Sequence, residues 1–237
     1  MSFDAAYGRE RVTAYLFLPK HSSPPFQTVV FFPGADAFGE DKLDLSSVED
    51  TYDFLMKSGR ALIFPIYKGM YQRRDGLVPG GGSPPGFRRD HEIAWSKDLG
   101  RTLDYLETRK EIDSTKLAYL GLSAGACEGA HLLAVEKRIK AAILDSGGLQ
   151  LTIHYLPEGD PLNFVTHVTI PVLMLNGRYD DYFPMESSQL PLFRLLGTPD
   201  RDKKHVVYEA GHGDYPRAAA VRERLDWLDK YLGQVRH

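Results

Sequence analysis

A serine between two glycines stands where an apolar run changes into a helix-forming segment, and this feature restricts the fold more than any other. The apolar run at 117–120 predicts a buried strand, and the sequence Gly-Leu-Ser-Ala-Gly at 121–125 follows it directly. A serine on so tight a strand-to-helix turn is held in a strained conformation, with its hydroxyl projecting above the edge of the sheet. The helix that begins at Ala124 offers free N–H groups and positive potential to a developing oxyanion. The turn therefore predicts that Ser123 is a nucleophile; the alternative is a turn of small residues that only packs against a sheet.

Strands and helices are predicted to alternate along the whole chain. Short, almost wholly apolar runs such as 28–32 are typical of strands that are buried on both faces of a parallel sheet. The predicted strands cover 11–18, 28–32, 61–64, 116–120, 140–144, 172–175 and 205–208, and the predicted helices cover about 46–57, 90–109, 124–138, 185–196 and 216–232. This alternation predicts an α/β fold, in one domain over residues 1–237, with a mostly parallel central sheet and helices on both faces. Ligands of such sheets bind beyond the carboxyl ends of the strands, where Ser123 lies.

Two acidic residues and a histidine follow later strands, in the order that a triad of this architecture requires. Asp180 and Asp181 lie in the loop after the strand 172–175, and His212 lies between two glycines after the strand 205–208. A single aspartate in such a loop more often caps a helix, so one of the pair is expected to cap and the other to be catalytic. A histidine between glycines is hard to explain by core packing, although a solvated side chain would also fit.

The order serine, acid, histidine, with each residue after a predicted strand, resembles the α/β-hydrolase superfamily. Within it, the chain is most similar to the group of dienelactone hydrolases, acetyl xylan esterases and prolyl-oligopeptidase-like enzymes. Related hydrolases carry the acid in a Gly-x-x-Asp sequence with a proline four residues further on, which fits Gly177, Asp180 and Pro184. The resemblance implies Ser123 as the nucleophile, His212 as the base and Asp180 as the acid that orients the base.

The same resemblance implies an oxyanion hole made of two backbone N–H groups. One is expected from Ala124, directly after the nucleophile, and the other from Ala35, in the loop after the first buried strand. Related enzymes often have His-Gly in that loop, where this chain has Pro33 and Gly34. The backbone donor remains while the usual side chain is missing. The resemblance implies no cofactor.

Two segments are predicted to shape the substrate pocket. Residues 67–89 form a long loop rich in Gly, Pro and Arg, and such loops often act as lids, although some are merely mobile. Residues 147–168 are predicted to form a small cap, and a surface excursion packed on itself is an equally good interpretation. Tyr67, Leu122 and Leu149 are the side chains that we expect to line the pocket.

Composition and charge argue against several classes of function. A net charge of −3 gives no indication of nucleic-acid binding, and a single cysteine excludes an internal disulfide. Histidines and carboxylates show no spacing typical of metal ligands, so no metal is expected. The sequence has no apolar run long enough to span a bilayer, and its beginning lacks the features of a signal peptide. We therefore expect a cytoplasmic protein with no membrane or nucleic-acid partner, and the sequence leaves its oligomeric state open.

Together these features predict a serine carboxylic-ester hydrolase that acts on small-molecule esters with short acyl groups through an acyl-enzyme. A peptidase or an acyltransferase of the same fold remains an alternative, because the acyl-enzyme does not dictate the acceptor. The alternative from another class is a non-catalytic domain that binds a ligand in the hydrolase pocket. Similarity of the sequences at 98–106 and 176–180 to hydrolase domains attached to some bacterial protein kinases favours that alternative. The presence of all three triad residues argues against it.

Overall fold

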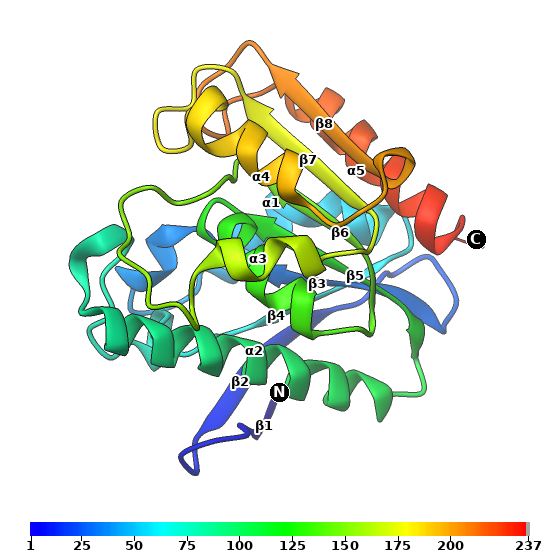
Figure 1. Ribbon diagram of the computed structural model, residues 1–237. Coiled ribbons are helices and arrows are strands. Elements are labelled where there is room, and N and C mark those ends of the chain that lie inside the picture. The colour runs from blue at the N-terminus through cyan, green and yellow to red at the C-terminus, as the bar shows by residue number, and fades with distance from the viewer. Residues whose placement is uncertain (236–237) are drawn as a thin grey trace.

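The computed structural model describes residues 1–235, and within them eight strands form one sheet (Figure 1). The strands are β1 (Ser2–Asp4), β2 (Arg11–Phe17), β3 (Phe26–Phe32), β4 (Ala61–Pro65), β5 (Ile112–Leu122), β6 (Ile139–Asp145), β7 (Val172–Gly177) and β8 (Lys203–Tyr208). Their order across the sheet is β1-β2-β4-β3-β5-β6-β7-β8. β1 is antiparallel to β2, and β2 is antiparallel to β4, whereas all other neighbours are parallel. The prediction of a mostly parallel sheet is confirmed.

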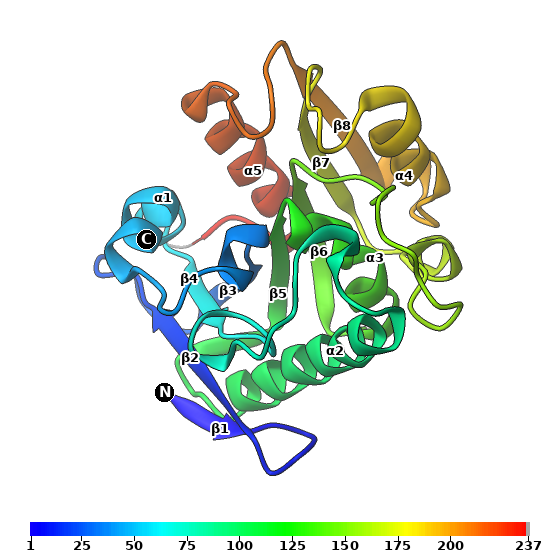
Figure 2. The same cartoon turned by 90° about the vertical axis from the view of Figure 1, so that its left-hand side faces the viewer.

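Helices cover both faces of this sheet, as predicted. α1 (Leu45–Lys57) and α5 (Arg217–Leu232) lie on one face (Figure 2). α2 (Pro85–Glu107), α3 (Ala124–Val135) and the short α4 (Leu190–Leu195) lie on the other. Among the helices of residues 1–235, none combines the length and the apolar character that a membrane span requires.

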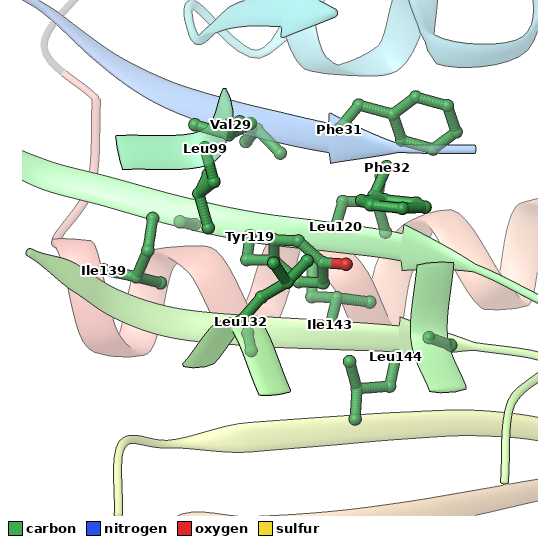
Figure 3. Close-up of a cluster of buried hydrophobic side chains, with 14 of the residues drawn as sticks. Val29, Phe31, Phe32, Leu99, Tyr119, Leu120, Leu132, Ile139, Ile143 and Leu144 are labelled. Carbon is green, nitrogen blue, oxygen red and sulfur yellow. The ribbon is translucent and has the colours of Figure 1, made fainter. Parts of the chain in front are cut away.

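The central strands are buried on both faces because successive side chains point alternately to the two helical layers. On β3, the ring of Phe31 contacts Tyr52 of α1, with ring centroids 4.6 Å apart. The next residue, Phe32, points to the opposite face and contacts Trp95 of α2 at 5.5 Å. Figure 3 shows both phenylalanines at the carboxyl end of β3, with Tyr119 and Leu120 on the neighbouring strand β5. Burial of each such ring contributes about 2–3 kcal/mol, so β3 and β5 form a well-packed platform for the turn that follows β5.

Several element boundaries differ from the predicted ones. α2 begins at Pro85 rather than at residue 90, because proline fits the first turn of a helix without breaking it. α1 begins after Asp44, whose side chain accepts a hydrogen bond of 3.0 Å from the N–H of Ser46. The segment predicted as one helix from 185 to 196 consists of a π-helical turn, Met185–Gln189, followed by α4. β1 is absent from the prediction, because three residues carry too little alternation to be recognised.

Candidate active site

The turn after β5 holds Ser123 in a backbone conformation that few residues adopt, with φ 52° and ψ −106°. Only glycine fits on either side. A Cβ at Gly121 would lie 2.4 Å from the carbonyl oxygen of Gly125, and a Cβ at Gly125 would lie 2.3 Å from that of Phe32. From within the sheet, the hydroxyl of Tyr119 donates a hydrogen bond of 2.6 Å to the Gly125 carbonyl oxygen. The surrounding structure thus fixes the turn and presents Ser123 Oγ at the end of β5.

We expect Gly125→Ala to lower the free energy of unfolding by about 3 kcal/mol, because the added methyl group meets backbone that cannot move without shifting β3. Gly86→Ala is the matched control, since a Cβ at Gly86 in α2 meets nothing within 4 Å. That variant is expected to be unchanged or up to about 1 kcal/mol more stable. Chemical denaturation of both variants measures the difference. Equal stabilities would show that the turn after β5 is looser than its contacts indicate.

The three side chains predicted as a triad lie in one hydrogen-bonded chain. His212 Nε2 lies 2.9 Å from Ser123 Oγ, and His212 Nδ1 lies 2.7 Å from Asp180 Oδ2. The other carboxylate oxygen, Asp180 Oδ1, accepts hydrogen bonds of 2.9 Å from the N–H groups of Tyr182 and Phe183. Because Nδ1 faces this carboxylate, the neutral imidazole carries its proton on Nδ1, and Nε2 is left as a hydrogen-bond acceptor for the Ser123 hydroxyl.

The adjacent aspartates occupy different environments. Asp180 is 3% exposed and uses both oxygens inside the protein. Asp181 is exposed at the cavity and does not contact His212 through a hydrogen bond. Asp180 also accepts hydrogen bonds from two N–H groups of its own loop, so one carboxylate makes both the capping contacts and the contact with His212, which the sequence led us to expect from two different aspartates. The catalytic role of Asp180 stays a prediction.

The two alanines predicted to form the oxyanion hole come from neighbouring loops. Ala124 is the first residue of α3, and Ala35 begins the short 3-10 helix Ala35–Phe38 after β3. The two loops approach closely, since a Cβ at Gly34 would lie 3.5 Å from Ser123 Cβ. Within residues 1–235, neither alanine N–H donates a hydrogen bond to the chain. Both donors are therefore free to bind an oxygen atom beside the serine.

Ser123 and His212 line a cavity of about 850 Å³. Part of its wall comes from the predicted lid, at residues 79–80, and from the predicted cap, at Gln150, Thr152 and Ile153. These segments touch each other, since a Cβ at Gly81 would lie 2.2 Å from the carbonyl oxygen of Thr152. We call residues 79–81 and 150–153 the loop pair. Apolar side chains elsewhere in the wall are Phe38, Leu122, Tyr182 and Phe183.

Of the three predicted pocket residues, only Leu122 lines this cavity. Tyr67 is completely buried, and its ring stacks on Phe32 with centroids 4.2 Å apart. Leu149 is held against the π-helical turn, because its carbonyl oxygen accepts a hydrogen bond of 2.7 Å from the hydroxyl of Ser188. The predictions for Tyr67 and Leu149 are therefore wrong: neither lines the cavity, Tyr67 belongs to the hydrophobic core, and Leu149 packs against it.

The base of the predicted lid is anchored by buried charges. Arg73 donates hydrogen bonds to Asp98 Oδ2 at 2.6 Å and to the carbonyl oxygen of Ile66 at 2.8 Å. Asp98, in α2, also accepts a hydrogen bond of 2.8 Å from the hydroxyl of Tyr7. Residues 85–89, predicted as part of the lid, are instead the first turns of α2.

Buried ion pairs in the cavity wall are the features that sequence reasoning missed. Arg88 of α2 donates to Glu128 of α3, and Arg224 of α5 donates to Asp145 at the end of β6 with an Nε–Oδ2 distance of 2.9 Å. Arg88 also donates to Glu92 at 3.0 Å, and burial raises the pKa of that carboxyl group. The four-residue spacing of Arg88 and Glu92 was the only available sequence signal. Within residues 1–235, no His, Cys, Asp and Glu side chains are arranged to hold a metal ion.

The sheet order and the serine turn after β5 define the α/β-hydrolase fold, and solved structures agree. The chain superimposes on a cold-adapted esterase from an Arctic intertidal metagenomic library with a TM-score of 0.75 and 22% identity, covering 100% of this chain and 93% of that one. An acetyl xylan esterase from Paenibacillus sp. R4 superimposes with a TM-score of 0.72 and 16% identity, covering 97% of this chain and 82% of that one. An α/β-hydrolase from Penicillium sp. sh18 gives 0.73 at 14% identity, with 98% of each chain covered. Identities this low establish the fold alone.

Sequence comparison adds a more limited similarity. No protein-family model matches the chain. The chain is 28% identical over 170 residues to an uncharacterized protein of Mycobacterium tuberculosis (strain ATCC 25618 / H37Rv). The aligned region covers 66% of this chain and 58% of that protein. The chain thus spans less than two thirds of the length of the curated relatives that it matches.

Proposed function

We propose that the protein is a serine hydrolase that cleaves carboxylic esters of small molecules through an acyl-enzyme. The observation that carries the proposal is the hydrogen-bonded chain from Asp180 through His212 to Ser123 in the wall of an open cavity. Two of the similar structures are described as esterases, which supports the same reaction class.

In the first step, His212 Nε2 accepts the proton of the Ser123 hydroxyl while Oγ bonds to the ester carbonyl carbon. The π electrons of the carbonyl group move to its oxygen, which becomes the oxyanion of a tetrahedral intermediate. Asp180 stabilises the imidazolium without taking its proton. The N–H groups of Ala35 and Ala124 donate to the oxyanion, and each lowers the barrier by about 3 kcal/mol.

In the second step, the imidazolium of His212 gives its proton to the ester oxygen as the C–O bond breaks, and the alcohol leaves. Water then attacks the acyl-enzyme and transfers a proton to Nε2. Collapse of the second tetrahedral intermediate releases the carboxylic acid and returns that proton to Ser123 Oγ. His212 therefore acts once as a base and once as an acid in each half of the cycle.

A fluorophosphonate probe tests the proposal directly. We expect it to modify Ser123 in the tryptic peptide 117–137, and hydrolysis of p-nitrophenyl butanoate to fall in step with the modification. Modification without hydrolysis of any ester would favour a peptidase or an acyltransferase, because those enzymes share the activated serine. A protein that is neither modified nor hydrolytic would be a ligand-binding domain instead.

Short acyl groups are expected to be preferred, at about two to six carbons. The charged pairs Arg88–Glu128 and Asp145–Arg224 in the cavity wall interrupt any continuous apolar path for a long chain. The measurement is kcat/KM for p-nitrophenyl esters of increasing acyl length, below their aggregation limits. We expect the butanoyl ester to exceed the dodecanoyl ester by at least about tenfold. A higher value for the dodecanoyl ester would contradict this view of the cavity.

A further inference from the structure

One polar part of the cavity wall takes no part in the proposed reaction. It consists of Tyr52 on α1, Asp145 at the end of β6 and Arg224 on α5, on the sheet face that α1 and α5 cover (Figure 2). This part lies next to the nucleophile, because the carbonyl oxygen of Asp145 accepts a hydrogen bond of 2.8 Å from the N–H of Ser123. A group bound there would belong to the molecule whose ester lies at Ser123.

Among residues 1–235, one oxygen of the Asp145 carboxylate has hydrogen-bond partners and the other has none. Arg224 lies 2.9 Å from Oδ2 through Nε and 2.8 Å through Nη2. Within residues 1–235, Oδ1 has no hydrogen-bond partner, although Asp145 is only 2% exposed. Burial raises the pKa of Asp145, and Arg224 opposes that shift. Because buried polar atoms are almost always hydrogen-bonded, we expect Oδ1 to accept a hydrogen bond from a bound molecule.

Tyr52 supplies a second polar atom without a partner. Its ring is 7% exposed and packs on Phe31, whereas its hydroxyl makes no hydrogen bond to any residue in 1–235. Burial and the charge of Asp145 raise the pKa of this hydroxyl, so it stays neutral. A neutral phenol can both donate and accept a hydrogen bond. Tyr52 also lines the cavity, so a molecule bound there can lie against this side chain.

We propose that Tyr52, Asp145 and Arg224 form a hydroxyl subsite, which binds a hydroxyl group carried by the substrate. The proposal rests on the proposed ester hydrolysis and narrows its substrates to esters of hydroxylated acids or alcohols. The substrate hydroxyl donates to Asp145 Oδ1 and accepts from the hydroxyl of Tyr52 or from Arg224. Both unpartnered atoms then have partners.

Charged substituents fit this subsite less well than a hydroxyl. A carboxylate would lie beside Asp145, and an ammonium group would lie beside Arg224, so each meets a like charge inside a buried ion pair. A methyl group has the size of a hydroxyl and leaves Oδ1 without a donor. Sites built to bind a hydroxyl discriminate strongly against analogues that lack it, for this reason.

Pairs of esters that differ only by hydroxyl and methyl test the subsite. On the alcohol side, 2-hydroxyethyl butanoate is compared with propyl butanoate. On the acyl side, each enantiomer of ethyl 3-hydroxybutanoate is compared with ethyl 3-methylbutanoate. Initial rates follow acid release at constant pH. We expect at least about a tenfold higher kcat/KM for the hydroxyl ester in one pair.

Tyr52→Phe is expected to reduce that hydroxyl-to-methyl ratio by about fivefold to tenfold. The variant removes only an oxygen that bonds no other residue of the described chain, so its folding is preserved. Tyr67→Phe is the matched control, because it removes a buried, unpartnered hydroxyl that does not line the cavity. Its ratio should equal that of the wild type. Equal rates within both ester pairs, or a Tyr52→Phe ratio like that of the wild type, would overturn the subsite.

Binding to the Ser123→Ala variant separates the subsite from the reaction. Titration calorimetry with the same esters should show tighter binding of the hydroxyl member, and Tyr52→Phe in this background should remove the difference. That result without hydrolysis by the wild type would retain the subsite and reject the proposed function. Hydrolysis by the wild type, with equal binding of the two esters in each pair, would retain the proposed function and reject the subsite. Tighter binding of ethyl hydrogen succinate than of the hydroxyl esters would overturn the subsite as well.

Discussion

Ser123→Ala is expected to lower kcat/KM toward p-nitrophenyl butanoate by about five orders of magnitude while the protein stays folded. The loss is large because Oγ is the atom that bonds to the carbonyl carbon in the proposed reaction, and among residues 1–235 no other hydroxyl is hydrogen-bonded to His212. We expect folding to be preserved, since within residues 1–235 the Ser123 side chain has this one hydrogen bond and alanine differs from serine only by the missing oxygen. The rate that remains would come from the oxyanion donors and from substrate binding.

Ser146→Ala provides the matched control for this variant. Ser146 follows β6 as Ser123 follows β5, and it has the same φ of 52°. Its hydroxyl is hydrogen-bonded to the hydroxyl of Tyr215 at 2.8 Å, whereas the ring nitrogens of His212 are hydrogen-bonded to Asp180 and Ser123. We expect Ser146→Ala to keep activity within about tenfold of the wild type. Full activity in Ser123→Ala, with thermal unfolding matched to the control, would remove the serine from the mechanism.

Asp180→Asn is expected to lower turnover by about four orders of magnitude, whereas Asp181→Asn changes it by less than about tenfold. An asparagine at 180 can still accept hydrogen bonds from the N–H groups of Tyr182 and Phe183 through its carbonyl oxygen. Its NH₂ group then faces His212 Nδ1 and favours the tautomer with the proton on Nε2. In that tautomer the imidazole cannot take the proton of Ser123.

The comparison requires kcat values for both variants at matched thermal stability. Asp181 is exposed, so its change to asparagine alters mainly the charge at the cavity. A larger loss for Asp181→Asn than for Asp180→Asn would assign the acid to Asp181. Similar, mild losses for both would show that neither carboxylate supports the histidine.

The turn that carries Ser123 and the loops that carry Asp180 and His212 could be predicted, because short sequence patterns identify each of them. Gly121 is required by a contact within the turn and Gly125 by a contact with the end of β3, and both glycines stand in one short sequence after an apolar strand. The loops that carry Asp180 and His212 follow β7 and β8, so parallel strand order alone brings them to the same edge as Ser123. The choice of Asp180 over Asp181 came from a family resemblance.

The cavity wall could not be predicted, because it is built from elements that are far apart in the sequence. Asp145 and Arg224 meet only after β6 and α5 have packed, and neither position reveals its partner. Tyr67 was assigned to the pocket because it follows a strand, yet its ring turns inward onto Phe32. A residue that follows a strand can be predicted to lie at the edge of the sheet. The direction of its side chain depends on the residues that pack around it.

The contact within the loop pair means that the sequences at 79–81 and 150–153 cannot change independently of each other. Gly81 touches the Thr152 backbone so closely that any side chain there must displace the opposite loop. A graft that replaces one loop alone would therefore create either a collision or a gap in the wall. The two loops are best exchanged together in designed variants, and in evolution we expect them to be inherited as a single unit. The scaffold of β5 and α3 beneath them can stay as it is while the substrate range changes.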